Sequence, residues 1–311
     1  MNSSFKTSGQ APHIGRYANI LLDAWFKRTF TQGPNCKKLL ILFLRELITD
    51  RHIEDISYGP QEAVNPNPGG RGIRLDIECT DSDGSRFLVE MQRAPQMDFY
   101  QRAVFNSTFG VQRQLVVGNG YDFAPVYFIG IMDFTLHAGD PRFIYRYSIT
   151  ENESHEQMTD RLNYIFLELP KCGDSPDASV LEKFGFALHN MYRLENVPAG
   201  FTEEVLLLLF KSAELSTFTP EEQQEYQRNM TSELDIKNQI AYAHITGLAE
   251  GKAEGLAEGK AEGKAEGKAE GKAEGKAEGK AEVARKMLER GIERETISEL
   301  TGLSPEEVAA L

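Results

Sequence analysis

Residues 73–92 alternate between apolar and polar side chains with a period of two, the pattern of extended strands with two different faces. The apolar positions are Ile73, Leu75, Ile77 and Cys79 before the segment Asp81-Ser82-Asp83-Gly84, and Phe87, Val89 and Met91 after it. An Asp-Gly turn between two alternating runs is a strong signal for a β-hairpin. The chain is therefore expected to build a sheet around this hairpin.

The segments around the hairpin predict a mixed α/β fold. Helical spacing of apolar residues predicts helices over 20–30, 37–48, 99–116, 180–193 and 202–212. Apolar or alternating runs predict strands over 125–134, 142–149 and 162–169, and the Pro- and Gly-rich stretch predicts a loop or sheet edge over 56–72. This order indicates an α/β sandwich around a mixed sheet flanked by helices.

The polar face of the hairpin is rich in carboxylates. Strand alternation places Asp76 and Glu78 on one face of the first strand, and Glu90 and Gln92 on one face of the second. If the Asp-Gly turn sets the register, these side chains converge on one side of the sheet. Two close carboxylates attract a hard cation such as Mg²⁺, which can activate water and stabilise charge on a phosphate.

Several motifs accompany the order Asp76, hairpin, Glu90-x-Gln92. They are Asp23-Ala24-Trp25-Phe26-Lys27, Leu75-Asp76-Ile77, Val89-Glu90-Met91-Gln92, Arg102 with a Gln-rich helix that ends at Gly118-x-Gly120-Tyr121, Pro125-Val126-Tyr127-Phe128-Ile129, Phe166-Leu167-Glu168-Leu169-Pro170-Lys171 and a tail of glycine-spaced charged repeats. This series resembles the Rpn family of recombination-promoting nucleases, also described as PD-(D/E)XK transposases. The resemblance covers most of residues 20–246.

The resemblance implies a restriction-endonuclease-like domain over 16–246, after a loose N-terminal tail over 1–15. It also implies a magnesium-dependent endonuclease, with Mn²⁺ as a substitute, that cleaves double-stranded DNA in recombination or mobile-element biology. In this interpretation Asp76 and Glu90 bind the metal, the Met91 carbonyl helps, and Gln92 occupies the position of the superfamily lysine. The alternative is a weak or inactive relative that binds DNA or protein and self-assembles.

A neutral Gln92 can orient water but supplies no positive charge, so we expect either weaker catalysis or a positive charge from elsewhere. No lysine occurs between Lys38 and Lys171. We therefore expect Lys27 to contact the active site or a phosphate, although a solvated helix lysine explains it equally well. Arg93 and Arg102, close to the motif in sequence, are the candidate contacts with DNA phosphates.

Other acidic residues leave alternatives open. Glu78 is a candidate second carboxylate or a solvent-facing strand residue, and Asp23 and Glu46 are candidate third ligands or surface residues. Asp81-x-Asp83-Gly84 starts like a calcium loop but lacks the later Glu, which favours a hairpin turn. The six histidines show no metal-ligand spacing, and no nucleotide-cofactor motif is present.

Residues 247–282 repeat the tetrad Gly-Lys-Ala-Glu, with leucine in place of lysine at Leu248 and Leu256. Nine glycines in a helix would cost about 9 kcal/mol relative to alanine, and all charged pairs at i,i+4 are of like sign. We expect a marginal helix or a flexible spacer. Gly and Ala allow close helix–helix approach, so a homo-oligomer through the tail stays open.

Residues 283–311 predict a small helical module. Gly291 ends one helix, and Ser304-Pro305-Glu306-Glu307 combines an N-cap, a proline at the first helical position and a capping-box glutamate. A helix-turn-helix is one interpretation. Docking or self-association is the one we favour, because DNA-reading domains are usually basic.

The net charge of −13 argues against a protein that coats DNA by charge alone. Most of that charge lies in residues 201–311, which hold 14 basic and 23 acidic residues, whereas residues 1–200 hold 20 and 24. The apolar runs are too short to span a bilayer, and the N-terminus lacks the apolar core of a signal peptide. Three scattered cysteines predict neither a disulfide framework nor a zinc site, so a cytoplasmic protein is expected.

Overall fold

The computed structural model describes residues 15–63, 72–116, 118 and 120–311. The chain divides into two compact units, Met1–Thr231 and Ser232–Leu311. The predicted loose tail over 1–15 lies outside the described residues except for Gly15. Among the described residues, no helix is both long and apolar enough to cross a membrane.

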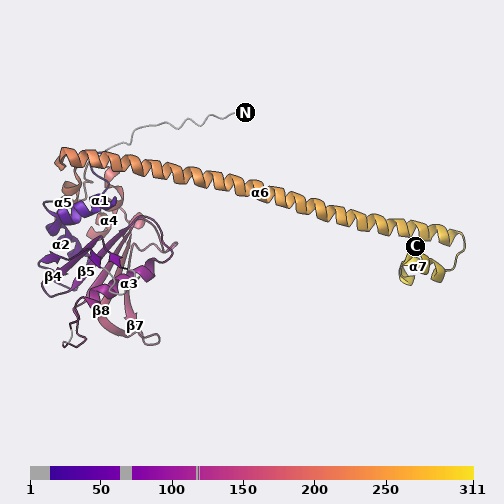
Figure 1. Ribbon diagram of the computed structural model, residues 1–311, viewed down its shortest axis with the longest axis horizontal. Helices are drawn as coiled ribbons and strands as arrows, with labels where there is room; N and C mark the ends of the chain where they lie inside the picture. Colours follow the sequence, from indigo (N-terminus) through magenta and orange to yellow (C-terminus); the bar gives the residue numbers. More distant parts are fainter. Residues whose placement is uncertain (1–14, 64–71, 117, 119) are drawn as a thin grey trace. The chain divides into compact units, whose positions relative to one another are not determined.

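The first unit is built on a six-stranded mixed sheet with the strand order β1-β4-β5-β6-β8-β7 (Figure 1). Its strands are β1 (Ile56–Tyr58), β4 (Ile77–Asp81), β5 (Arg86–Gln92), β6 (Val126–Met132), β7 (Ile144–Thr150) and β8 (Gln157–Glu168). The β5–β6 and β6–β8 pairs are parallel, and the other pairs are antiparallel. A second, two-stranded sheet joins β2 (Glu62–Ala63) to β3 (Ile73–Arg74).

The hairpin prediction is confirmed by the antiparallel pairing of β4 with β5, in which Ile77 lies opposite Val89. The Asp81 side chain closes the turn, because its Oδ1 accepts hydrogen bonds from the backbone N–H groups of Asp83 (3.0 Å) and Ser85 (2.8 Å). Gly84 adopts a φ of +84°, which favours glycine at this position. The calcium-loop alternative has no support, since this carboxylate is used by the turn.

One detail of the hairpin differs from the sequence expectation. The first alternating run is not one strand, because the chain bends at Asp76 between β3 and β4. The stretch predicted as a loop or sheet edge over 56–72 contains β1, which is an edge strand of the six-stranded sheet, and β2 of the two-stranded sheet. Residues 64–71 lie outside the described part.

Helices cover both faces of the sheet. The apolar residues of β4–β6 that point to one face, such as Phe87 and Ile129, join the main core with helices α2 (Cys36–Leu47), α4 (Val180–Asn190) and α5 (Glu204–Ala213). On the other face, α3 (Phe99–Gln112) packs on Leu88, Phe128 and Phe166 (Figure 1). This arrangement confirms the predicted α/β sandwich.

The first predicted helix has two parts, α1 (Asp23–Lys27) and a π-helical segment η1 (Arg28–Gln32). π-helical turns are rare and often occur at functional sites. Trp25 of α1 stacks on Phe218 at 5.1 Å, in a small core that also contains Tyr226. Short 3-10 turns are present at η2 (Leu169–Lys171), η3 (Met191–Arg193) and η4 (Leu215–Thr217).

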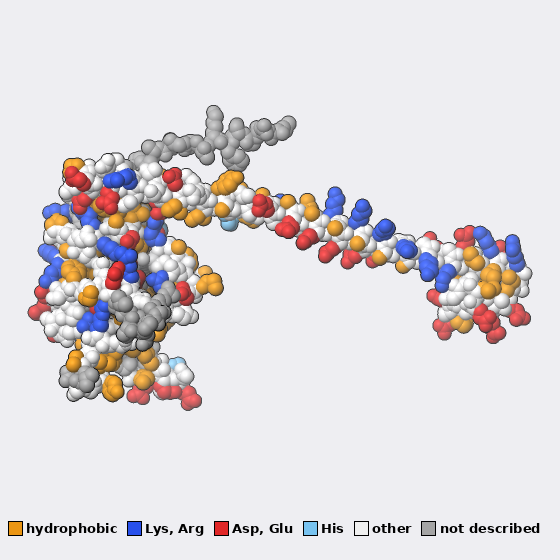
Figure 2. Space-filling view, viewed as in Figure 1, with side chains coloured by type: hydrophobic (Ala, Val, Ile, Leu, Met, Phe, Trp, Pro, Cys, Tyr) orange, Lys and Arg blue, Asp and Glu red, His pale blue; other side chains and the backbone are white. Residues whose placement is uncertain are grey.

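The tetrad repeat is helical. Helix α6 extends over Pro220–Glu289 and so contains all of residues 247–282, as in the marginal-helix alternative. A Cβ added to any of the nine repeat glycines would meet nothing within 4 Å. Within the repeat, lysine and glutamate side chains project from opposite sides of the helix (Figure 2).

The C-terminal module contains α7 (Arg294–Thr301) and α8 (Pro305–Ala309), which follow the end of α6. Ala284, Ile297 and Val308 form its buried centre, surrounded by partly buried apolar residues of the same segments. Gly291 and Gly302 adopt positive φ angles of +78° and +65° at the two turns. The predicted capping box is present at Ser304 and Glu307.

Candidate active site

Asp76 and Glu90 lie opposite each other where β4 begins and β5 nears its end. Because Ile77 pairs with Val89, the next antiparallel positions are Asp76 and Glu90, on one face of the sheet. The backbone N–H of Met91 donates a 2.8 Å hydrogen bond to Asp76 Oδ2, which fixes that carboxyl beside β5. The bend at Asp76 and the hairpin register therefore bring the two acids together.

Glu90 is a buried carboxyl that lacks a full set of partners. Its side chain is 8% exposed, and within the described part of the chain its Oε1 is buried without a hydrogen bond. Arg102 of α3 lies 3.8 Å away, from its Nη2 to Glu90 Oε2. Burial, followed by the charge of Asp76, raises the pKa of Glu90 to about 8. A cation bound between the two carboxyls would offset this penalty.

The pKa of Asp76 is raised as well. Burial raises its pKa, the hydrogen bond from the Met91 N–H lowers it, and Asp23 and Lys27 act in opposite directions. Both acids thus hold protons more tightly than ordinary carboxyls do, for the same physical cause. A pair of carboxyls with raised pKa values in one place is a functional-site signal.

Lys27 reaches the pair from α1. Its Nζ lies 3.8 Å from Asp76 Oδ1 and 2.9 Å from Asp23 Oδ1, and its side chain is 15% exposed. The structure therefore brings Lys27 to the site, where its ammonium group lies close to the carboxyls of both Asp76 and Asp23. Asp23 itself is 68% exposed and pairs with Lys27.

The remaining predicted residues surround the pair at the end of β5. Gln92 shares the face of Glu90, and its side-chain amide donates to the Ala94 carbonyl at 3.3 Å. Met91 points to the opposite face with 8% exposure, so its backbone rather than its side chain is near Asp76. Arg93 directly follows β5, and Arg102 also donates to the Gln96 side chain.

Glu78 is not part of the candidate metal site. Its side chain is fully buried and forms ion pairs with Arg86, at 2.9 Å, and with Arg113. Glu46 is exposed on α2. Across the described residues, no group of three or more His, Cys, Asp or Glu side chains is placed to hold a metal. Asp76 and Glu90 would therefore hold a cation as a pair, with the other positions filled by water or substrate oxygens.

A cavity of about 410 Å³ lies beside Arg102, between β3 and α3. Arg74 and Gln101 line it together with Phe105 and the buried Asn106. Sequence reasoning missed these α3 and β3 residues as potential contributors, because only the fold of α3 onto the sheet gathers them around Arg102, which pairs with Glu90. The helical spacing of Gln101, Arg102 and Phe105 is the one available signal.

The family model described as PD-(D/E)XK nuclease family transposase matches residues 20–243, most of the chain. The protein belongs to this family. No curated protein matches the sequence.

In this PD-(D/E)XK family member, a second model matches residues 277–311 and is described as the Rpn/YhgA-like nuclease family C-terminal HTH domain. Both matches support the resemblance to Rpn nucleases. The second corrects our preference for a docking or self-association module, because the alternative that we ranked lower, a helix-turn-helix, is the one supported. The acidic net charge did not indicate this motif, because helix-turn-helix domains in general contact DNA through a few side chains of one helix.

Proposed function

We propose that this protein is a metal-dependent endonuclease that hydrolyses phosphodiester bonds of double-stranded DNA, in recombination or mobile-element biology in the cytoplasm. The observation that carries the proposal is the Asp76–Glu90 pair, with a buried Glu90 oxygen that has no hydrogen bond among the described residues. Oxygen ligands of this kind suit Mg²⁺ or Mn²⁺. Family membership supplies the reaction class.

The chain's own residues would divide the work as follows. Asp76 and Glu90 bind the cation, with the Met91 carbonyl as a further ligand, and the Gln92 amide orients the attacking water. When bound, Mg²⁺ supplies Lewis acidity toward the phosphate and favours deprotonation of water near neutral pH. Lys27, 3.8 Å from Asp76, places positive charge where the phosphate develops negative charge. Arg93 and Arg102 contact the DNA backbone.

The test is cleavage of supercoiled plasmid with Mg²⁺, Mn²⁺ or EDTA, together with Mn²⁺ binding by calorimetry. Asp76→Ala and Glu90→Ala should abolish both cleavage and Mn²⁺ binding. Glu46→Ala is the matched control, because Glu46 is an exposed acid on α2. Metal-independent cleavage, or full activity in either site variant, would refute the assignment.

A second candidate is a DNA-binding protein without efficient cleavage. Two observations favour it: Gln92 stands where a lysine is expected, and the C-terminal segment matches an HTH domain. It predicts that Asp76→Ala and Glu90→Ala keep the DNA affinity of the wild type, while no metal supports cleavage by folded protein.

We also propose that the tail self-associates through α6. In the repeat, lysine and glutamate columns lie on opposite sides of a helix whose other positions are Gly, Ala and the two leucines Leu248 and Leu256 (Figure 2). The lysine column of one copy can therefore face the glutamate column of another. Sedimentation equilibrium of the full chain and of a chain ending at residue 246 tests this; monomers in both cases would exclude it.

A further inference from the structure

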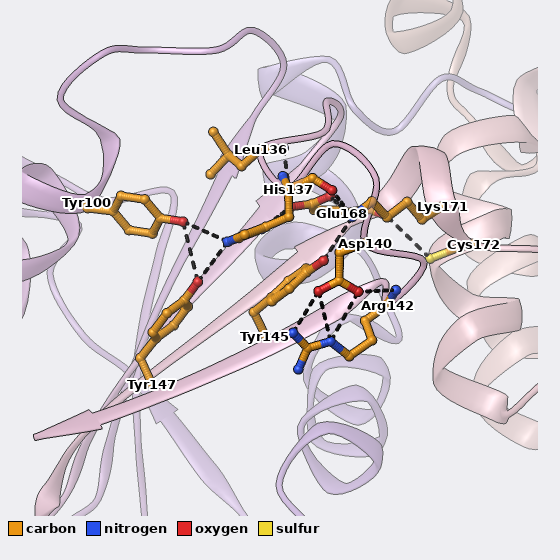
Figure 3. A network of polar contacts seen from close by, with 10 residues as sticks. All are labelled: Tyr100, Leu136, His137, Asp140, Arg142, Tyr145, Tyr147, Glu168, Lys171 and Cys172. Carbon is orange, nitrogen blue, oxygen red and sulfur yellow. Dashed lines mark hydrogen bonds and ion pairs between the residues drawn. The ribbon is translucent and has the colours of Figure 1, made fainter. Parts of the chain in front are cut away.

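A second polar cluster lies at the end of β8 and is centred on Glu168, whose side chain is completely buried. Its Oε1 accepts hydrogen bonds from the backbone N–H groups of Leu136 (3.2 Å) and His137 (3.1 Å) and lies 2.6 Å from His137 Nδ1. Its Oε2 pairs with Lys171 Nζ at 2.7 Å. The carboxylate is thus compensated by one lysine and oriented toward one imidazole (Figure 3).

The His137 ring is held in one orientation. It stacks on Tyr145 with 3.8 Å between ring centroids, and Lys171 Nζ donates to both the Tyr145 hydroxyl (2.9 Å) and the His137 carbonyl (2.8 Å). With Nδ1 directed at the Glu168 carboxylate, the N–H belongs on Nδ1 and the free lone pair on Nε2. The cluster therefore presents Nε2 at a fixed place.

Two tyrosine hydroxyls converge on that nitrogen. His137 Nε2 lies 3.2 Å from the Tyr100 hydroxyl and 3.0 Å from the Tyr147 hydroxyl, and these hydroxyls are 3.4 Å apart (Figure 3). Both tyrosines are partly open to solvent, with 40% and 39% exposure. A single lone pair accepts one hydroxyl proton along its axis, which leaves the second O–H group with the other hydroxyl oxygen, at 3.4 Å, the long limit of a hydrogen bond. An incoming acceptor at this solvent-open place can compete for that proton.

This cluster lies on the same face of the sheet as the carboxyl pair. In the parallel register, Glu90 aligns with Gly130 and Phe166, and Gln92 aligns with Met132 and Glu168. The cluster is therefore two strand spacings, about 10 Å, from the β5 site. The first turns of α3 reach both places, because Arg102 pairs with Glu90 while Tyr100 contacts His137.

We infer that Tyr100, Tyr147 and His137 form a binding subsite for a backbone phosphate of the DNA strand that is cut at Asp76 and Glu90. The inference rests on the proposed nuclease function. A charged phosphate oxygen is a stronger acceptor than the neighbouring hydroxyl oxygen at 3.4 Å, and the carboxylate behind the imidazole is already paired with Lys171. Glu168 and Lys171 are positioning residues, since the buried Glu168 carboxylate and the largely buried Lys171 hold the His137 ring from behind.

The test uses the full chain and a random 20-base-pair duplex in Ca²⁺, which lets binding be measured without turnover. The variant is Tyr100→Phe/Tyr147→Phe, which removes two hydroxyls and keeps both rings against Phe166. Tyr121→Phe is the control, because Tyr121 is 90% exposed. Fluorescence anisotropy gives the affinity, and ¹⁵N-histidine NMR, assigned with His137→Asn, reports whether DNA reaches this ring.

We expect the double variant to bind the duplex about tenfold more weakly, as for the loss of a hydrogen bond to a charged group, with an unchanged melting temperature and Mn²⁺ affinity. The His137 resonance should shift when DNA is added to the wild type. An unchanged affinity together with an unmoved His137 resonance would overturn the inference and leave the cluster as a structural brace. If the wild type shows the shift but cleaves no DNA in any metal, the nuclease proposal fails and the phosphate subsite stands.

Discussion

At the residue scale, Glu90 makes the stability of the metal-free protein depend on pH. Its pKa in the folded protein, about 8, lies above the ordinary value of 4.5, so between these values the folded state keeps a proton that the unfolded chain releases. The free energy of unfolding of the metal-free protein should therefore fall as pH rises from about 5 to 8. Asp76, whose pKa is also raised, acts in the same direction.

Glu90→Gln should remove most of this dependence. In EDTA, the variant should melt above the wild type at pH 8.5, by the equivalent of a few kcal/mol at most, and close to it at pH 5. Thermal denaturation over a pH series measures the difference. A melting difference that is constant with pH would contradict this account of Glu90.

Metal binding should release a proton for the same reason. Near pH 7 Glu90 is mostly protonated, and a carboxyl must lose its proton to become a ligand. Calorimetry of Mn²⁺ binding in two buffers of different ionisation enthalpy should report close to one proton released per ion. No buffer dependence would mean that Glu90 is not a ligand or is already ionised.

Lys27 should matter for turnover more than for metal affinity. Lys27→Met removes the positive charge beside Asp76 and should lower the cleavage rate by about 10²-fold, in the range seen when one electrostatic contact to a transition state is lost. Lys27→Arg should restore part of the rate. Plasmid cleavage under single-turnover conditions gives the rates, and equal rates in all three proteins would return Lys27 to the role of a surface lysine.

Residue-level prediction reached the central pair because strand alternation and an Asp-Gly turn are local signals. It could not decide the role of Glu78, whose partner Arg113 comes from the far end of α3. It also missed His137, Tyr100 and Tyr147, which come from a loop, a helix and a strand and meet only in the folded sheet. Contacts across long sequence separations have no period to detect.

At the element scale, Gly130 of β6 allows α3 to approach the sheet. It is the residue beside Glu90, and a Cβ there would lie 2.7 Å from Phe166 Cδ1 and 2.9 Å from Phe99 Cζ. Gly130→Ala should cost about 1–3 kcal/mol of unfolding free energy and shift α3, which carries Arg102 and Tyr100.

Urea denaturation and DNA affinity together test this prediction. Gly259→Ala is the control, because that glycine lies in α6 with nothing within 4 Å of an added Cβ, and alanine favours a helix by about 1 kcal/mol. A Gly130→Ala protein with wild-type stability would show that the aromatic rings can move aside.

Element boundaries were the least predictable part of the fold. The helix expected over 99–116 is α3, but the strand expected from residue 73 breaks at Asp76, where the chain leaves one sheet and enters another. Alternation continues through the break, because Leu75 and Ile77 are both buried although they belong to different cores. The alternating pattern predicts which residues are buried, but it does not predict in which sheet or core they are buried.

At the scale of the whole molecule, composition predicted the C-terminal segments less well than local sequence patterns predicted the sheet. The acidic total of residues 201–311 argued against DNA contact, yet residues 277–311 match an HTH domain. For this C-terminal module an average over many residues hid the arrangement of a few. For the repeat, expected to be a marginal helix or a flexible spacer, the structure has the helical alternative.

The two matched segments should be separable in function. A chain ending at residue 276 should keep metal-dependent cleavage and lose most of the DNA affinity that the C-terminal segment provides. Anisotropy with a labelled duplex and plasmid cleavage at saturating DNA measure the two properties. Unchanged affinity would show that the HTH domain does not bind DNA in this protein.

The tetrad period of α6 differs from the 3.6 residues of a helical turn, so each repeat rotates every column by about 40°. Nine repeats complete about one revolution, and the lysine and glutamate columns wind round the helix as two opposed stripes. A straight polyanion such as duplex DNA laid along the helix meets attraction and repulsion in turn. The repeat therefore has little net attraction for DNA along its length. It can lie near nucleic acid without competing for DNA with the segments 20–243 and 277–311.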